Sequence, residues 1–293
     1  KAGSRKRERI MVGHYPDTLQ EALRKIKEYP EATIYAGGTD LMVAKKFAHH
    51  IIFINHIPEL KGIAKRDAYL YLGVCNTFSD LINMQQIPHI MKKVFSNVAS
   101  PAIRNMGTIG GNLCNASPVG DSLPMWYGMN AEIELTGLDE KAREYKRQIP
   151  ISQFIRGIRK IDRRPGELVT GILIPEKALR KETFFYAEKV GARRSEAISK
   201  ISIFGLAQID DHRLTRVDVA FGAVGITVIY KPELLEPMKG TTKEEFHKLK
   251  SEIAEKYMTF IKPIDDQRSS SLYRKQVAGN LLKDFFDQIE NRL

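Results

Sequence analysis

The chain has 293 residues, of which 43% are hydrophobic, and a formal net charge of +11 from 46 basic and 35 acidic residues. This length is enough for about two globular domains, and no run approaches the ~18 apolar residues that a membrane-spanning helix needs. The basic N-terminus lacks the apolar stretch of a secretory signal, so we expect a cytoplasmic protein. Two cysteines, Cys75 and Cys114, give no disulfide framework and too few ligands for an iron–sulfur cluster, and we expect no metal site.

The positive charge alone is compatible with a nucleic acid, a membrane surface, an anionic ligand or an acidic partner. Its densest run consists of Arg156, Arg159, Lys160, Arg163 and Arg164. Aromatic residues that stack on bases are not interleaved with this run, and no nucleic-acid-binding motif accompanies it. We therefore interpret the run as a solvated or protein-docking face, and we expect no nucleic-acid partner.

The N-terminal part of the chain predicts a small βαβ-like unit with parallel strands. Thr18 and Glu21 form a capping box that begins the first helix. The expected elements are a helix over 19–29, a strand over 32–35, a helix over 41–47 and a strand over 51–54. A glycine loop over 36–40 precedes the second helix, where unpaired N–H groups and the helix dipole favour an anion.

The middle of the chain predicts a larger set of strands and helices around one unusual stretch. We expect a hairpin over 62–64 and 69–74, helices beginning near 77 and 88, a helix over 122–129, paired strands over 131–136 and 143–149, a short helical piece over 151–155, and a strand over 167–174. The stretch from Arg104 to Asp121 fits neither periodicity and contains Gly107, Gly110 and Gly111. We expect it to be a long functional loop.

The last third predicts an antiparallel sheet of three strands, over 183–190, 198–209 and 214–224, followed by two helices. Thr242 caps the first helix, which runs to about residue 260. We expect the last helix to bury one apolar stripe made of Leu272, Val277, Leu281, Phe285, Ile289 and Leu293. Strands and helices in separate blocks indicate an α+β fold.

The two glycine segments share one pattern. Each combines a glycine pair with a hydroxyl, Thr39 or Thr108, and a polar residue, Asp40 or Asn112. Glycine lets backbone N–H groups face a ligand without a Cβ in the way, so two such segments suggest one ligand with two phosphates. The sequence contains neither GxGxxG after a strand nor GxxxxGK[ST], so a Rossmann site and a P-loop are unsupported.

These segments carry a family resemblance. Tyr35–Leu41 and Thr108–Asn112, which lie 71 positions apart from residue 37 to residue 108, resemble the FAD-binding subunit of the molybdenum hydroxylases. That family includes xanthine dehydrogenase, carbon monoxide dehydrogenase and nicotinate dehydrogenase. The resemblance continues through Asn115–Pro118 to Asp121, through Glu167–Val169 before a strand that ends in Ile-Pro, and through Lys189 ahead of two arginines. It covers nearly the whole chain.

The resemblance implies the fold and the cofactor. We expect a two-part FAD-binding domain of the p-cresol methylhydroxylase-like type over 1–178, with a small subdomain over about 1–57 and a larger one over about 58–178. A smaller α+β domain is expected over 179–293. The residues that the resemblance assigns to FAD binding are Tyr35, Ala36, Gly37, Gly38, Thr39, Asp40, Leu41, Thr108, Ile109, Gly110, Gly111, Asn112, Asp121, Val169 and Lys189.

The resemblance also implies roles within that set. Amides of Gly37, Gly38, Gly110 and Gly111 would hold the diphosphate. Asp121 matches an acid that holds a polar part of the cofactor; it can also be an N-cap. Val169 and Lys189 match positions beside the isoalloxazine, where a lysine would favour a reduced, negatively charged flavin; Lys189 can also be a surface lysine at a strand end. A carboxylate repels phosphates, so if Asp40 touches the cofactor it should accept from a hydroxyl or a backbone N–H.

The implied function is that of an oxidoreductase subunit. In this family a molybdopterin-containing large subunit hydroxylates the substrate, and [2Fe–2S] clusters of a small subunit relay electrons to FAD. The FAD passes them to NAD⁺ or another acceptor, and we expect a heterohexamer. One alternative is a stand-alone flavoprotein oxidase or reductase of the same fold, for which no general-base pair is evident. The other is a basic nucleic-acid-binding or scaffold protein in which the glycine loops have only a structural role.

Overall fold

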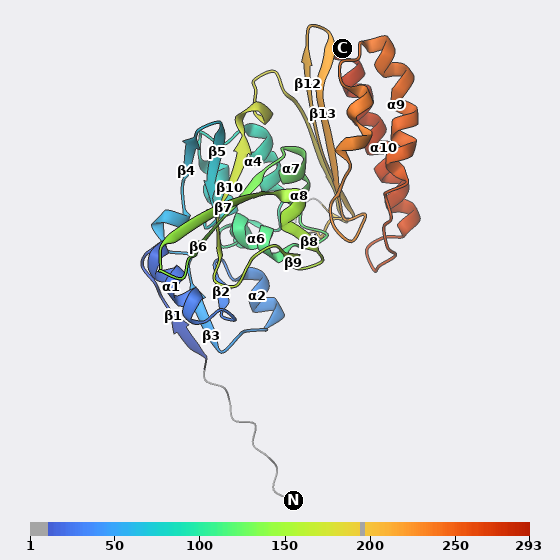
Figure 1. Cartoon of the computed structure of the whole chain (residues 1–293). Coiled ribbons are helices and arrows are strands. Elements are labelled where there is room, and N and C mark those ends of the chain that lie inside the picture. The colour runs from blue at the N-terminus through green and yellow to red at the C-terminus, as the bar shows by residue number, and fades with distance from the viewer. Residues whose placement is uncertain (1–10, 194–196) are drawn as a thin grey trace, which may run out of the picture.

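Three larger β-sheets, a two-stranded hairpin and the helices between them organise the described part of the chain (Figure 1). The structure is a computed structural model that describes residues 11–193 and 197–293. The first sheet is small and entirely parallel, in the order β1-β3-β2, with β1 at Val12–His14, β2 at Thr33–Tyr35 and β3 at His50–Phe53. The helices of this unit are α1 (Leu19–Glu28) and α2 (Thr39–Ala44). The expected parallel βαβ unit is confirmed, but α2 begins two residues earlier than expected, inside the first glycine segment.

The second sheet has five antiparallel strands in the order β4-β5-β10-β6-β7. Their bounds are β4 Ile63–Arg66, β5 Tyr69–Gly73, β6 Glu132–Leu138, β7 Glu144–Pro150 and β10 Leu168–Pro175. The expected hairpin and the expected pair of strands are both confirmed. All eight residues of β10 are buried, because this strand lies at the centre of the sheet and carries no charge.

Short elements surround this sheet. The helices are α3 (Phe78–Asn83), α4 (His89–Ser96), α5 (Pro101–Arg104), α6 (Ile109–Asn115), α7 (Leu123–Gly128) and α8 (Ile151–Phe154). A hairpin of β8 (Ile155–Gly157) and β9 (Lys160–Ile161) precedes β10. Single 3₁₀ turns lie at Pro58–Leu60, Glu176–Ala178, Pro232–Leu234 and Glu236–Met238.

The expectation that Arg104–Asp121 forms a loop throughout is wrong in the middle, where α6 lies. Thr108 is the N-cap of α6, and its Oγ1 accepts a hydrogen bond from the N–H of Gly111 at 3.0 Å. Gly110 packs so closely on Val74 that a Cβ at this position would lie 2.5 Å from the Cβ of Val74. A tertiary contact therefore supports a helical turn that glycine alone would disfavour.

The third sheet is antiparallel, in the order β11-β12-β13-β14. Its strands are β11 (Phe184–Val190), β12 (Ile201–Asp210), β13 (Arg213–Gly222) and β14 (Ile229–Tyr230). The three expected strands are confirmed, and β14 adds a short fourth one. The helices α9 (Lys243–Met258) and α10 (Ser271–Glu290) cover the face of this sheet that is turned away from the rest of the chain (Figure 1).

The strand β12 packs on both sides. Phe204 faces α7, where a Cβ on Gly128 would lie 2.5 Å from its ring. The next residue, Gly205, faces α10, where a Cβ would lie 2.5 Å from the ring of Phe285. Successive side chains of a strand point to opposite faces, so β12 contributes alternately to the two hydrophobic cores of the chain.

The expected stripe of α10 is partly wrong. Leu272 is 76% exposed, because it lies in the first turn of a helix whose buried face begins at Arg274. The buried residues of this helix are Arg274, Ala278, Leu282, Phe285, Phe286 and Ile289. Phe285 and Ile289 are common to both sets, whereas Val277, Leu281 and Leu293 are only partly buried against the same core.

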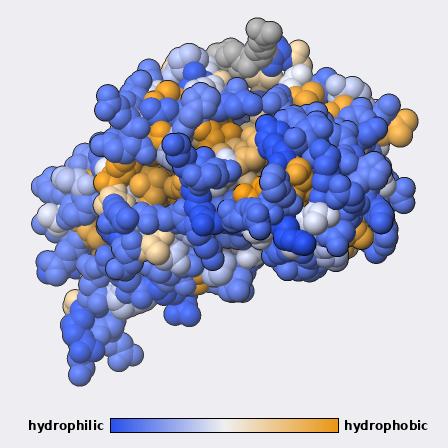
Figure 2. Space-filling model, turned by 90° about the horizontal axis from the view of Figure 1, so that it is seen from above, coloured by the Kyte–Doolittle hydropathy of each residue, from blue (hydrophilic) through white to orange (hydrophobic). Residues whose placement is uncertain are grey.

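The surface seen in Figure 2 is largely hydrophilic, and its apolar residues gather in hollows. None of the helices within 11–193 and 197–293 combines the length and the hydrophobicity needed to cross a bilayer. The domain boundary expected at residue 178 stays a prediction.

Candidate functional site

A cavity of about 490 Å³ brings the two glycine segments together. Eleven of the fifteen residues assigned to FAD binding line it: Ala36, Gly37, Gly38, Thr39, Asp40, Leu41, Thr108, Gly110, Gly111, Asn112 and Val169. The other four, Tyr35, Ile109, Asp121 and Lys189, are not among the lining residues. A cavity of this size, with apolar walls and a few polar groups, is typical of a small-molecule or cofactor site.

The first glycine segment is in direct contact with Met106 and Gly107, the two residues immediately ahead of the second segment. A Cβ added to Gly37 would lie 2.0 Å from the carbonyl oxygen of Met106 and 3.0 Å from the Cα of Gly107. These backbones approach this closely only because residue 37 has no side chain. Two segments that lie far apart in the sequence therefore form one continuous wall of the cavity.

The first glycine segment presents unpaired backbone donors. Gly38 is the N-cap of α2 and has a left-handed backbone (φ 70°), which glycine adopts without strain. In the described part of the chain, the N–H groups of Gly38, Thr39, Asp40 and Leu41 make no hydrogen bond. Unpaired N–H groups at a helix start favour a negatively charged ligand.

The second glycine segment differs from its expected role. The N–H of Gly110 donates to the carbonyl oxygen of Val74 at 2.9 Å, and the N–H of Gly111 donates to Thr108 Oγ1 at 3.0 Å. These two amides are therefore already paired within the protein. The structural role of Gly110 is close packing. The polar residues of this segment that line the cavity are Thr108 and Asn112, and the Oδ1 of Asn112 accepts from the hydroxyl of Ser122 at 2.7 Å.

A chain of three side chains links the first glycine segment to the β8–β9 hairpin. The Nδ2 of Asn115 donates to a carboxylate oxygen of Asp40, and the Oδ1 of Asn115 accepts from Nη1 of Arg159 at 2.9 Å. All three residues line the cavity. The donor to Asp40 within the protein is thus a side-chain amide. The expected contact of Asp40 with a hydroxyl or a backbone N–H at the cofactor stays a prediction.

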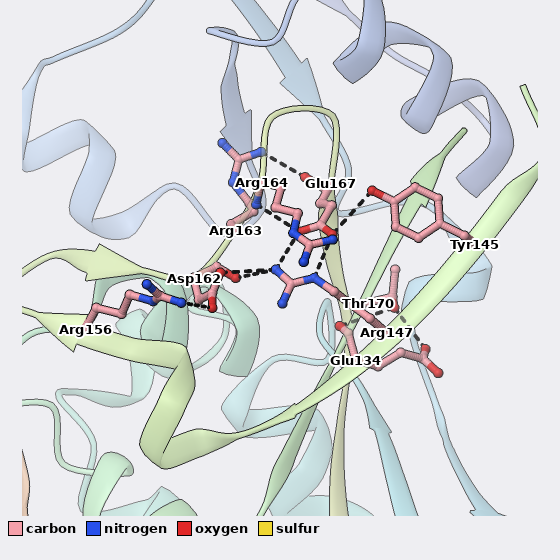
Figure 3. A network of polar contacts seen from close by, with 9 residues as sticks. All are labelled: Glu134, Tyr145, Arg147, Arg156, Asp162, Arg163, Arg164, Glu167 and Thr170. Atoms are coloured by element: carbon pink, nitrogen blue, oxygen red, sulfur yellow. Dashed lines mark hydrogen bonds and ion pairs between the residues drawn. The ribbon is translucent and has the colours of Figure 1, made fainter. Parts of the chain in front are cut away.

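Four of the five residues of the basic run are exposed, as expected of a solvated face: Arg156, Arg159, Lys160 and Arg164. Two residues of the run, Arg159 and Arg163, also line the cavity, which we did not expect, and the protein-docking alternative stays a prediction. The loop around them is fixed by a network that Figure 3 shows. Arg147 on β7 donates from Nε and Nη2 to the two carboxylate oxygens of Glu167, both at 2.7 Å, and from Nη2 to the carbonyl oxygen of Asp162 at 2.7 Å. A second arginine, Arg156, also donates to the Asp162 carboxylate.

Glu167 is the buried centre of this network and is fully inaccessible to solvent. Burial alone would raise the pKa of its carboxyl group. The hydrogen bonds and charge of Arg147, together with the N–H of Arg164 at 2.8 Å, outweigh burial and lower the pKa. Glu167 is therefore ionised, and its charge is balanced by Arg147.

Asp121 and Lys189 form an ion pair of 2.6 Å in which each side chain is 11% exposed. Lys189 also donates to the carbonyl oxygen of Asn97 at 2.7 Å, next to the cavity-lining Val98, and Ser199 donates to Asp121. Burial raises the pKa of Asp121, while Lys189 and the hydroxyl of Ser199 oppose this shift. The surface-lysine interpretation of Lys189 is thus wrong. The N-cap interpretation of Asp121 is also wrong, because Ser122 is the N-cap of α7 and no side chain caps this helix.

Tyr35 and Ile109 support the glycine segments from behind. A Cβ on Gly38 would lie 2.0 Å from the hydroxyl oxygen of Tyr35, so this ring lies directly against that glycine. Ile109 is completely buried in the larger hydrophobic core. Sequence reasoning had no local signal for Asn115, Arg159 and Arg163 as cavity residues, because only the folded hairpin brings them there.

The walls beyond the glycine segments are apolar and include Val74, Phe78, Val98, Leu168 and Val169. The cavity thus combines unpaired N–H donors and two arginines with an apolar compartment. A flavin dinucleotide has a diphosphate and an apolar ring system, so the residues present fit this group.

Both cysteines should be unreactive in the folded protein. Burial raises the pKa of Cys75 and of Cys114 to about 12, although both residues line the cavity and Cys114 is only partly buried. At pH 8 about one thiol in ten thousand is then a thiolate, which is the reactive form. We expect a disulfide reagent to modify neither thiol in the native state and both after denaturation. Fast labelling of one thiol in the native protein would contradict this.

Comparisons with known proteins agree with this site. The family model "FAD binding domain in molybdopterin dehydrogenase" matches residues 9–177, and "CO dehydrogenase flavoprotein C-terminal domain" matches residues 186–289. The chain is 29% identical to the nicotinate dehydrogenase FAD-subunit of Eubacterium barkeri, covering 95% of each chain. It is 28% identical to the xanthine dehydrogenase FAD-binding subunit of Escherichia coli O157:H7, covering 74% of this chain and 75% of the relative.

Solved structures share the fold. Reconstituted CO dehydrogenase from Oligotropha carboxidovorans superposes with a TM-score of 0.84 at 23% identity, covering 97% of this chain and 98% of the other. Quinoline 2-oxidoreductase from Pseudomonas putida 86 superposes with a TM-score of 0.82 at 19% identity, covering 96% of this chain and 97% of the other. With the first family model matching more than half of its length, the chain belongs to the family of FAD-binding domains of the molybdopterin dehydrogenases.

Proposed function

We propose that the chain is the FAD-binding electron-transfer subunit of a multi-subunit molybdenum hydroxylase. It takes electrons from [2Fe–2S] clusters of a partner chain and passes them to NAD⁺ or another acceptor. The observation that carries this proposal is the shared wall of the two glycine segments around one cavity of about 490 Å³. Bound FAD supplies the chemistry, since it can take up and release electrons one or two at a time.

The residues of the chain bind and orient this cofactor. Gly38, Thr39, Asp40 and Leu41 would hold the diphosphate through their unpaired N–H groups. Val98 and Val169 would flank the ring system and exclude water from it. Gly110 of the second segment acts through close packing, and Tyr35 and Ile109 support the binding wall from the side of the core.

The Asp121–Lys189 pair, which adjoins Val98 through Asn97, would contribute at the ring end of the site. Because Lys189 is paired with a carboxylate, the pair as a whole carries little net charge. We therefore propose that Lys189 orients Asp121, instead of acting as an isolated cation beside the flavin.

The chain needs partners for a complete activity. A [2Fe–2S] cluster has four protein ligands, usually cysteines, and the sequence holds two cysteines in all. Residues 11–193 and 197–293 contain no group of three or more His, Cys, Asp or Glu that could hold a metal ion. We propose a molybdopterin-containing large subunit and a [2Fe–2S] small subunit as partners, assembled as a heterohexamer.

The purified chain should bind FAD and give a yellow protein with flavin absorption bands. Titration of the flavin-free chain with FAD, followed by flavin fluorescence and absorption, measures this. The FAD of the isolated chain should be reduced by a hydroxylase substrate only after the partner subunits are added. A colourless protein that does not bind added FAD would contradict the proposal. Rapid substrate turnover by the isolated chain would instead favour a stand-alone flavoprotein.

A further inference from the structure

The side chain of Arg159 is held at the cavity by an unusual backbone. Arg159 lies in the two-residue turn between β8 and β9 and has a left-handed conformation, with φ 55°. This conformation is unfavourable for a residue with a Cβ. It is fixed by the N–H of Arg159, which donates to the carbonyl oxygen of Ala116 at 3.2 Å. The fold thus maintains a strained turn that directs one arginine to the cavity.

The charge of Arg159 is not neutralised by a carboxylate. Among the described cavity-lining residues, Arg159 and Arg163 are basic and Asp40 is acidic. Within the described ranges, Arg159 forms no ion pair, and its side-chain hydrogen bond goes to the neutral amide of Asn115. Its neighbour Arg156 is different, because it pairs with Asp162. Arg159 therefore offers further guanidinium N–H donors and a full positive charge to a ligand.

Asn115 keeps Arg159 and Asp40 apart. A carboxylate can only accept hydrogen bonds and a guanidinium can only donate them, so the amide between them must donate with Nδ2 and accept with Oδ1. Both contacts are present. Without this spacer, Asp40 and Arg159 could pair directly. The guanidinium would then no longer be available to bind an anionic ligand. The spacer also gives the Asp40 carboxylate a hydrogen-bond donor, while the carboxylate keeps its negative charge.

Hydrogen bonds and ion pairs hold the hairpin that carries Arg159 in place. Asp162, one residue after β9, accepts hydrogen bonds from Arg156 and Arg147 (Figure 3). Arg147 is in turn bound by the buried Glu167. A binding side chain on a rigid element loses little freedom when its ligand arrives. The network in Figure 3 therefore gives the basic run a positioning role at the cavity.

We propose that Arg159 is an additional diphosphate-binding residue of the flavin site, linked to the first glycine segment through Asn115, and that Asn115 is its positioning residue. This inference rests on the proposed function, because the diphosphate is that of FAD. Arg159 would add a charge-assisted hydrogen bond to a phosphate oxygen, of the kind that guanidinium groups form best.

The test compares two flavins that differ in the diphosphate. FAD has it and riboflavin does not. We expect Arg159→Gln to raise the dissociation constant for FAD by about 10- to 100-fold and to leave that for riboflavin unchanged. Asn115→Asp should weaken FAD binding at least as much, because the new carboxylate pairs with Arg159 and adds negative charge beside Asp40. Fluorescence quenching of each flavin by the flavin-free full-length chain measures both constants.

Lys160→Gln is the matched control. It removes the same charge from the same hairpin, from an exposed side chain that does not line the cavity, and it should bind both flavins as the unchanged chain does. Thermal unfolding without ligand verifies that the variants fold. Equal FAD affinity of Arg159→Gln and Lys160→Gln would overturn the inference, as would parallel losses for FAD and riboflavin, which indicate a role in pocket shape. Failure of the unchanged chain to bind FAD would overturn the proposed function as well.

Discussion

Replacing Gly37 with alanine is expected to lower the affinity for FAD by at least about 100-fold. The new Cβ would lie 2.0 Å from the carbonyl oxygen and 2.8 Å from the carbonyl carbon of Met106. Both atoms belong to the backbone, so no side-chain rotation can relieve the clash, and the two glycine segments must separate. The loss is measured by titrating the flavin-free variant with FAD.

Gly279→Ala is the control for this substitution. Its Cβ would have its nearest contact at 3.8 Å, with the flexible end of Met258, and it lies within α10. Alanine inside a helix is favoured over glycine by about 0.5–1 kcal/mol. FAD affinity should therefore be unchanged and the unfolding temperature slightly raised. Normal FAD binding by Gly37→Ala would show that the contact between the segments does not shape the site.

Replacing Arg147 with methionine is expected to lower the free energy of unfolding by about 3–5 kcal/mol. Methionine fills part of the space but leaves the inaccessible carboxylate of Glu167 without its main partner. Lys146→Met on the same strand is the control, because Lys146 and Glu144 are half-exposed and 3.8 Å apart, and such pairs contribute about 0–1 kcal/mol. Urea unfolding at neutral pH compares the two variants, and equal stabilities would contradict this account.

The same network should make the protein sensitive to acid. The pKa of Glu167 in the folded state is lower than its ordinary value of 4.5. A lowered pKa contributes stability above the unfolded-state pKa, and this contribution is lost as the pH falls through the folded-state value. The stability difference between the unchanged chain and Glu167→Gln should therefore shrink below about pH 4.5.

The features that the sequence predicted well are those with local causes. The strands β11, β12 and β13 have long apolar or alternating runs with a clear turn at Asp210–Arg213, and the capping box of α9 fixes its start. The glycine segments were found because glycine is rare enough in pairs to stand out. Their shared pattern suggested one common ligand, and the family resemblance implied the same, but no local pattern reports a contact between residues 37 and 106.

The features that the sequence did not predict depend on tertiary contacts. Helix α6 contains a glycine pair that disfavours a helix locally, but Gly110 packs against Val74. The turn of the β8–β9 hairpin, Ile158–Arg159, lacks the glycine or asparagine that usually signals such a turn. The sequence therefore predicted an exposed basic run, but not that Arg159 and Arg163 also line the cavity. Its position at the cavity follows from the buried contact between Arg147 and Glu167, which are 20 positions apart.

The alternation along β12 has a consequence for how the protein can be divided. Phe204 and Leu206 belong to the core that contains α7, whereas Ile203 and Ala207 belong to the core that contains α9 and α10. Cutting the polypeptide ahead of β11 would expose the apolar residues of α7 in the N-terminal fragment. In the C-terminal fragment it would expose the face of the sheet that packs against α7. The two pieces would then be prone to aggregate when produced separately, and joint production would be the way to recover both.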